Sequence, residues 1–139
     1  MNNLNNKLYK VAVIGAGYIG SVLSAILASK GCKVFAIDIN ETIVNCINEG
    51  KSPIKEKGLE KLIKDNVAKG NLVACNEFSR IKDVDVILIT VGTPLKEDGT
   101  ADETAIKKVI KSIKPFVKEN QLIILKSTVP PYTTDNLSN

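Results

Sequence analysis

The sequence predicts an α/β domain built on a doubly wound, mainly parallel β-sheet. Short apolar runs rich in β-branched residues alternate with segments whose apolar residues recur at helical spacing, the pattern of strands connected by helices. The apolar runs contain few polar residues, as expected of parallel strands covered on both faces. A length of 139 residues without internal repeats fits a single domain.

The first part of the chain predicts a strand, a helix and a second strand. Residues 9–14 form a β-branched apolar run that stops at Gly15, as a buried strand would. Small and aliphatic residues dominate 18–29, and a glycine two residues later marks the end of this helix. The second strand covers 33–37 and ends immediately before Asp38.

Two further helices and a short third strand are expected next. Asn40 is well placed as the N-cap of a helix, because its side chain can accept a hydrogen bond from the first turn. Apolar residues again recur with a helical period in 59–69, and a glycine follows that segment. The expected elements are a helix through Asn48, a turn-rich link over 51–58, a helix over 59–69 and a strand over 72–75.

The last part of the chain predicts two more strands around one long helix. Residues 84–91 are almost continuously apolar and predict a buried strand. Residues 102–118 place apolar side chains on one face and lysines on the others, which predicts a helix that Pro115 ends or kinks. A strand over 121–125 and a polar, proline-rich loop over 127–134 complete the order.

The composition argues against several classes of function. The formal net charge is +4, the lysines are dispersed and aromatic residues make up 4%, so we expect no nucleic-acid binding. No apolar run is long enough to cross a membrane. Residues 1–8 are expected to be a frayed tail, because the Asn-rich start lacks the apolar segment of a secretory signal.

Metal chemistry and histidine-dependent catalysis are not expected either. The chain contains no histidine, which is the commonest base in alcohol dehydrogenation. Cys32, Cys46 and Cys75 are far apart and lack metal-ligand spacing, so we predict no metal site. We interpret them as free, small apolar side chains in a reducing cytoplasm.

A glycine-rich turn lies between the first strand and the first helix. The spacing G-x-G-x-x-G, with a strand before it and a helix after it, is typical of a Rossmann-type dinucleotide-binding turn. The first glycine permits the turn, the second leaves room for a pyrophosphate, and the third lets the helix pack closely against the strand. The free N–H groups at the start of the helix then face the phosphates. A turn that merely uses glycine is the alternative. The predicted cofactor-binding residues are Gly15, Ala16, Gly17, Tyr18, Ile19 and Gly20.

Asp38 bears on which dinucleotide is bound. A carboxylate at the end of the second strand can accept hydrogen bonds from both adenosine ribose hydroxyls, and it would repel a 2′-phosphate. This predicts NAD rather than NADP. The alternative is an aspartate that only caps the next helix, although Asn40 is better placed for that role.

Two loops follow strands whose C-terminal ends are expected at the same edge of the sheet as the glycine turn. Ligands of α/β folds bind at that edge. A glycine in the first loop would admit close approach, a proline would stiffen it, and the second loop would present hydroxyls. Ordinary turns remain the alternative for both loops. The candidate residues are Val91, Gly92, Thr93, Pro94, Ser127 and Thr128.

Taken together, these blocks resemble the nucleotide-sugar 6-dehydrogenases, which include the UDP-glucose, UDP-N-acetylmannosamine and GDP-mannose dehydrogenases. The resemblance covers residues 10–134 and is carried in order by 13–20, 34–40, 50–54 with 58–59, 91–94 and 127–130. It implies that 9–139 is an NAD-binding domain of an enzyme of polysaccharide biosynthesis. That enzyme oxidises the C6 alcohol of a UDP- or GDP-sugar to a carboxylate with two NAD.

The resemblance also implies where the remaining chemistry lies. In the family a cysteine thiolate in a later substrate domain attacks the sugar, so this chain alone is expected to be inactive and the full-length protein to be a homodimer. Residues 15–20 would hold the pyrophosphate, Asp38 the ribose, and the loops over 91–95 and 127–129 the reacting end. Thr128 matches a threonine that helps to position the hydrolytic water. The departures from the family pattern are Ile43 for a basic residue near the adenosine, Lys57 for a proline and Tyr132 for a glycine.

Two alternatives keep the same fold. One is another NAD-dependent dehydrogenase, of the hydroxyacid or hydroxyacyl-CoA type, against which the Ser-Thr-Val-Pro-Pro loop and the 50–58 link weigh. The other is a regulatory nucleotide sensor like the gating domains of potassium channels, which would not need hydroxyls after the last strand.

Overall fold

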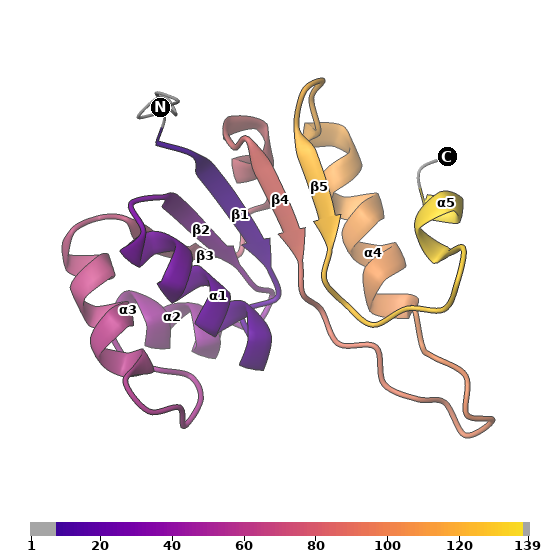
Figure 1. The fold of residues 1–139 in the computed structure, drawn as a ribbon, viewed down its shortest axis with the longest axis horizontal. Coiled ribbons are helices and arrows are strands. Elements are labelled where there is room, and N and C mark those ends of the chain that lie inside the picture. The colour runs from indigo at the N-terminus through magenta and orange to yellow at the C-terminus, as the bar shows by residue number, and fades with distance from the viewer. Residues whose placement is uncertain (1–7, 138–139) are drawn as a thin grey trace, which may run out of the picture.

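The five strands form one sheet in the order β3-β2-β1-β4-β5 (Figure 1). The structure is a computed structural model that describes residues 8–137, so the predicted tail lies outside the described residues except for the exposed Leu8. The strands are β1 (Lys10–Ile14), β2 (Lys33–Ile37), β3 (Leu72–Cys75), β4 (Val86–Ile89) and β5 (Leu122–Leu125). The helices are α1 (Tyr18–Ser29), α2 (Glu41–Asn48), α3 (Leu59–Ala68), α4 (Thr104–Ile113) and α5 (Thr133–Leu137), with short 3₁₀ helices η1 (Phe78–Asp83) and η2 (Lys114–Phe116).

Every pairing between these strands is parallel, as the apolar strand sequences predict. The chain proceeds outward from β1 to β3, then crosses back to place β4 beside β1 and β5 beyond it. The strand order therefore reverses between β1 and β4. Such a reversal opens a crevice at the carboxyl ends of the strands, where doubly wound sheets bind their ligands.

Alternate residues of β1 face two separate hydrophobic cores. Val11 and Val13 pack in the core that α1, α2 and α3 cover. Ala12 and Ile14 face the other core, which α4 and η1 cover. Helices thus cover both faces of the sheet, with α1 to α3 on one face and α4 on the other (Figure 1). This double cover explains why the strand sequences are apolar on both faces.

Most elements match the sequence prediction to within two residues. The bounds of α1, β2 and β3 are those expected. Asn40 is the N-cap of α2, and its side-chain oxygen accepts a hydrogen bond from the Thr42 N–H at 3.0 Å. Pro115 lies in η2, directly after the last α-helical residue, so the proline does end α4.

One local prediction is wrong, and two elements are slightly shorter than predicted. β4, and α4 together with η2, each begin and end two residues inside the predicted ranges of 84–91 and 102–118. The predicted loop over 127–134 runs into α5, which begins at Thr133. The 3₁₀ helix η1, which was not predicted from the sequence, covers part of one core through its buried Ile81.

A buried serine in α1 offers a test of the packing. Ser24 is fully buried, and its hydroxyl has no hydrogen-bond partner in the described part of the chain. Burying an unpaired hydroxyl is costly, so Ser24→Ala should raise the free energy of unfolding by about 1 kcal/mol. The matched control is Ser21→Ala, which removes a hydroxyl that donates to the Gly17 carbonyl at 2.7 Å and should give no gain. A lower melting temperature for Ser24→Ala than for the wild type would contradict this account.

Candidate functional site

The glycine turn after β1 is held in place by the neighbouring strand β2. Gly15 has a φ of +92°, a conformation that side-chain-bearing residues rarely adopt. Its N–H donates to the Ile37 carbonyl at 2.8 Å. The next N–H, of Ala16, donates to the Asp38 carboxylate at 2.7 Å. The turn therefore presents its following residues, and the start of α1, at the carboxyl edge of the sheet.

Gly20 allows α1 to lie directly against this turn. A Cβ added at Gly20 would lie 1.7 Å from the Gly15 carbonyl oxygen and 2.8 Å from the Thr90 hydroxyl. Thr90 was not predicted as a site residue, yet its hydroxyl bridges the Ile14 and Gly15 carbonyls at 3.0 and 2.7 Å. Thr90 thus joins the end of β4 to the glycine turn, across 75 residues of sequence.

Gly17 has a different surrounding from Gly20. A Cβ added at Gly17 would meet no atom within 4 Å, so this position faces open space. Gly17 is the N-cap of α1, no side chain caps the helix, and its first turn contains no acidic residue. Its first N–H groups are therefore available to an anion, and the helix dipole favours a negative charge there.

Asp38 already makes two hydrogen bonds within the chain. One carboxylate oxygen accepts from Ala16, and the other accepts from the Asn40 N–H at 2.8 Å. Each carboxylate oxygen has two lone pairs, so both retain capacity for a ribose hydroxyl. Asp38 does not cap α2, since Asn40 has that role, and the ribose contact stays a prediction.

Side-chain hydrogen bonds tie the two predicted loops to each other. Ser127 donates its hydroxyl to the Val91 carbonyl at 2.6 Å, and Thr93 donates to the Thr128 carbonyl at 2.7 Å. These two hydroxyls therefore brace the loops and can only accept a bond from a ligand. The exposed Thr128 hydroxyl makes no hydrogen bond to the described residues, so it is the one available to both donate and accept.

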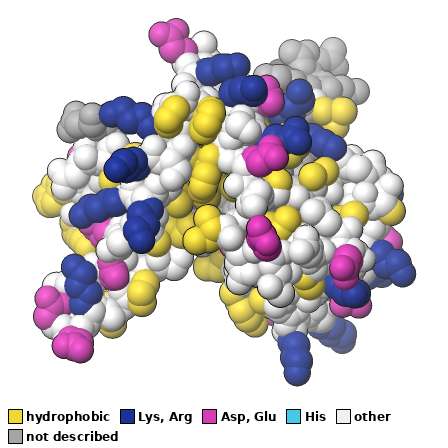
Figure 2. Space-filling model, turned by 180° about the vertical axis from the view of Figure 1, so that it is seen from behind, with side chains coloured by type: hydrophobic (Ala, Val, Ile, Leu, Met, Phe, Trp, Pro, Cys, Tyr) yellow, Lys and Arg dark blue, Asp and Glu magenta, His cyan; other side chains and the backbone are white. Residues whose placement is uncertain are grey.

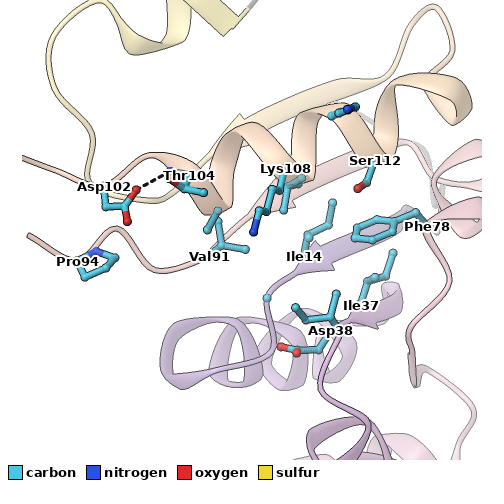
Figure 3. A pocket seen from close by; sticks show the side chains of 15 residues that line it. Ile14, Ile37, Asp38, Phe78, Val91, Pro94, Asp102, Thr104, Lys108 and Ser112 are labelled. Atoms are coloured by element: carbon cyan, nitrogen blue, oxygen red, sulfur yellow. Dashed lines mark hydrogen bonds between the residues drawn. The ribbon is translucent and has the colours of Figure 1, made fainter. Parts of the chain in front are cut away.

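A pocket of about 610 Å³ lies at the carboxyl ends of β1, β2 and β4, below α4 (Figure 3). Hydrophobic side chains gather along the hollow on this side of the molecule, and lysines are dispersed around it (Figure 2). The residues lining the pocket include Ile14, Gly15, Ile37, Asp38, Ile39, Phe78, Val91, Pro94, Asp102, Thr104, Lys108 and Lys111.

The main pocket is lined by only some of the predicted site residues. The pocket brings together Gly15, Asp38, Val91 and Pro94, whereas Gly92, Thr93, Ser127 and Thr128 lie on the adjacent loops and do not line it. Tyr18 and Ile19 are exposed and line another pocket, which is formed by α1, the segment before α3 and α3 itself. The contribution of α4 to the main pocket was not predicted from the sequence, because nothing local marks it.

The pocket is lined by charged side chains of both signs. Asp102 accepts a hydrogen bond from the Thr104 N–H at 2.9 Å (dashed in Figure 3). Hydrogen bonds from Thr104 hold the pKa of Asp102 below its ordinary value, so this carboxylate is ionised at neutral pH. Lys108 and Lys111 of α4 supply the positive charges.

The described residues fit a dinucleotide and show no arrangement for a metal ion. The open space at Gly17, the available amides of α1, the Asp38 carboxylate and the apolar pocket match a diphosphate, a ribose and an adenine. Within residues 8–137 no three histidine, cysteine or acidic side chains converge, and the three cysteines are free and half-buried. No helix in this range has the length and apolarity needed to span a membrane.

Asp38 offers a test of dinucleotide choice. Asp38→Asn replaces an acceptor-only group by one whose NH₂ cannot accept from Ala16, Asn40 or a ribose. We expect the affinity for NAD to fall about tenfold and the preference over NADP to shrink, since the charge that repels a 2′-phosphate is lost. Calorimetric titration with both cofactors measures this, with the exposed Glu119→Gln as control. An unchanged ratio of the two affinities would remove Asp38 from the site.

Comparison with known proteins identifies the family. The model of the "UDP-glucose/GDP-mannose dehydrogenase family, NAD binding domain" matches residues 9–139. A UDP-N-acetyl-D-mannosamine dehydrogenase of Methanococcus aeolicus is 37% identical over 134 residues, which cover 94% of this chain and 30% of that protein. A GDP-mannose 6-dehydrogenase of Pseudomonas aeruginosa is 35% identical over 92% of this chain and 30% of its own length.

Solved structures agree with these sequence matches. A ternary complex of GDP-mannose dehydrogenase from Pseudomonas aeruginosa superposes with a TM-score of 0.88 at 35% identity, over 91% of this chain and 30% of that one. A UDP-glucose dehydrogenase from Pyrobaculum islandicum gives a TM-score of 0.90 at 29% identity, over 99% and 33%. The chain thus spans about a third of the length of these relatives. These matches favour neither the potassium-channel sensor nor a dehydrogenase of another type. The chain belongs to the UDP-glucose/GDP-mannose dehydrogenase family and is the NAD-binding domain of a member of that family.

Proposed function

We propose that this chain is the cofactor-binding part of an enzyme that oxidises the C6 alcohol of a UDP- or GDP-sugar to a carboxylate. The observation that carries the proposal is the glycine turn held by Asp38 and Thr90 beside a pocket at the reversal of strand order. The family supports the reaction, since the relatives are named as UDP-N-acetyl-D-mannosamine and GDP-mannose dehydrogenases.

The chemistry is a four-electron oxidation. The alcohol carbon gives up two hydrides in succession, one water supplies the second carboxylate oxygen, and three protons are released. Bound NAD accepts one hydride in each of the two steps, so two NAD are reduced for each sugar.

The residues of this chain bind and orient the reactants. The N–H groups that follow Gly17 bind the diphosphate, and Asp38 accepts hydrogen bonds from the adenosine ribose. Ser127 and Thr93 brace the two loops after β4 and β5. This bracing holds the free hydroxyl of Thr128 at the edge where the reacting end of the cofactor lies, and there it positions the water that enters the product.

Thr128 can be tested in the full-length protein. Thr128→Val keeps the shape of the side chain but removes the hydroxyl, so kcat should fall about tenfold or more while the affinity for NAD stays near that of the wild type. Thr128→Ser retains a hydroxyl and should keep most of the activity. Stopped-flow and steady-state assays of NADH formation measure both variants. Wild-type kcat in Thr128→Val would exclude the hydroxyl from catalysis.

The direct test of the proposed function uses the full-length protein with UDP-glucose, UDP-N-acetylmannosamine and GDP-mannose in turn. We expect one of them to be oxidised with two NADH formed per sugar and a carboxylate in the product by mass spectrometry. This chain alone should bind NAD and form no NADH. A full-length protein that reduces NAD with none of the three sugars, or stops after one NADH, would contradict the proposal.

We also propose a cellular location and an oligomeric state for the full-length enzyme. We place it in the cytoplasm as a homodimer that supplies acidic sugars for polysaccharide synthesis. Size measurement by light scattering on the full-length protein tests the dimer, and a monomer at micromolar concentration would contradict it.

A further inference from the structure

One lysine of α4 extends into the main pocket without an ion-pair partner. Lys108 lines the pocket, and its side chain is directed from α4 toward the end of β1, between Val91 and Ile14 (Figure 3). The preceding Lys107 instead pairs with Glu103 at 3.4 Å and lines a different pocket. Among residues 8–137, no carboxylate lies within ion-pair distance of the Lys108 ammonium.

A bound dinucleotide would leave the pocket with excess negative charge unless a cation faced it. Asp38 and Asp102 already line the pocket, and the diphosphate adds further negative charge, whereas the positive side chains that line it are Lys108 and Lys111 of α4. The start of a helix such as α1 supplies the equivalent of only about half a positive charge. Asp38 has both carboxylate oxygens bonded to backbone N–H groups, so Lys108 is not needed as its partner.

We propose that Lys108 binds a phosphate oxygen of the dinucleotide from the α4 side of the pocket, opposite the glycine turn. The proposal rests on the cofactor position described under the proposed function, and it adds a residue to the cofactor site. An ammonium on a flexible four-carbon stem suits this task, since it can follow the phosphate while the stem covers the apolar wall. Because Lys108 is exposed in the free chain, its attraction for the phosphate should weaken as salt is added.

The test compares ligands with and without phosphate. NAD, ADP and adenosine are titrated calorimetrically into the wild-type chain and into Lys108→Met, Lys108→Arg and Lys114→Met. Lys114 is an exposed lysine that directly follows α4 and lines none of the three pockets, so it is the matched control. At low salt we expect Lys108→Met to weaken NAD and ADP about five- to tenfold and to leave adenosine unchanged. Lys108→Arg should restore most of the affinity, and Lys114→Met should behave as the wild type.

Each other outcome overturns the proposal in a recognisable way. If the wild type binds NAD and Lys108→Met binds it equally well, Lys108 has no part in the site although the proposed function stands. Equal losses for adenosine and ADP would make Lys108 a packing residue for the base. Failure of the wild type to bind NAD would overturn the cofactor site as well. Thermal unfolding of each variant confirms that it is folded at the titration temperature.

Discussion

Gly20→Ala is expected to destabilise the domain severely. The added methyl group would lie 1.7 Å from the Gly15 carbonyl oxygen, and a backbone atom held by Thr90 cannot move aside as a flexible side chain can. Relieving this clash requires α1 to move away from the sheet, which would open the core that α1 covers. We expect a loss of about 3 kcal/mol or more in the free energy of unfolding, and a melting temperature lower by about 10 °C.

Thermal and chemical denaturation of the purified chain measure this effect. Thr90→Val serves as a companion variant, since it removes the hydroxyl that bridges the Ile14 and Gly15 carbonyls without adding bulk. It should be destabilised by a smaller amount, about 1 to 2 kcal/mol. A Gly20→Ala protein with the wild-type melting temperature would show that α1 does not lie as close to the turn as described.

Gly17→Ala should produce the opposite combination, a stable chain that binds the cofactor poorly. No atom lies within 4 Å of the position of the new Cβ, so the methyl group meets no obstruction from the rest of the fold. The methyl group does, however, occupy space that a diphosphate needs in order to reach the N–H groups of α1. The affinity for NAD should fall at least about tenfold, while the melting temperature without ligand stays within a few degrees of the wild type.

The two glycine variants control for each other. Calorimetry gives the affinity, and thermal unfolding with and without NAD gives the stability and the ligand-induced shift. If Gly17→Ala binds NAD as tightly as the wild type, the diphosphate does not lie on α1. If the melting temperature of Gly17→Ala instead falls as far as that of Gly20→Ala, the space around Gly17 is not open as described.

The elements predicted most accurately are those whose ends are fixed by local chemistry. The bounds of α1 follow from a glycine turn before it and a glycine after it, and α2 begins where the Asn40 side chain caps it. Proline set the end of α4 in the same way. The short η1 and α5 were missed because neither is long enough to show a helical period.

The site was predicted only in part, because its geometry depends on contacts distant in sequence. The glycines, Asp38 and Val91 could be found from motifs and strand ends. The role of Thr90 could not, since its partners lie 75 and 76 residues away. Likewise, the hydroxyl of Ser127 was expected to face a ligand, but it donates to a backbone carbonyl 36 residues away. Lys108 is one of several lysines on α4 in the sequence, and only the packing of the helix shows which of them faces the pocket.

A crystal structure of this chain with NAD tests the central claim most directly. We predict that the diphosphate lies within hydrogen-bond distance of the N–H groups that follow Gly17, with the adenosine ribose on Asp38 and the adenine in the pocket below α4. A dinucleotide bound away from the glycine turn, or a pocket that side chains fill in its presence, would contradict the account.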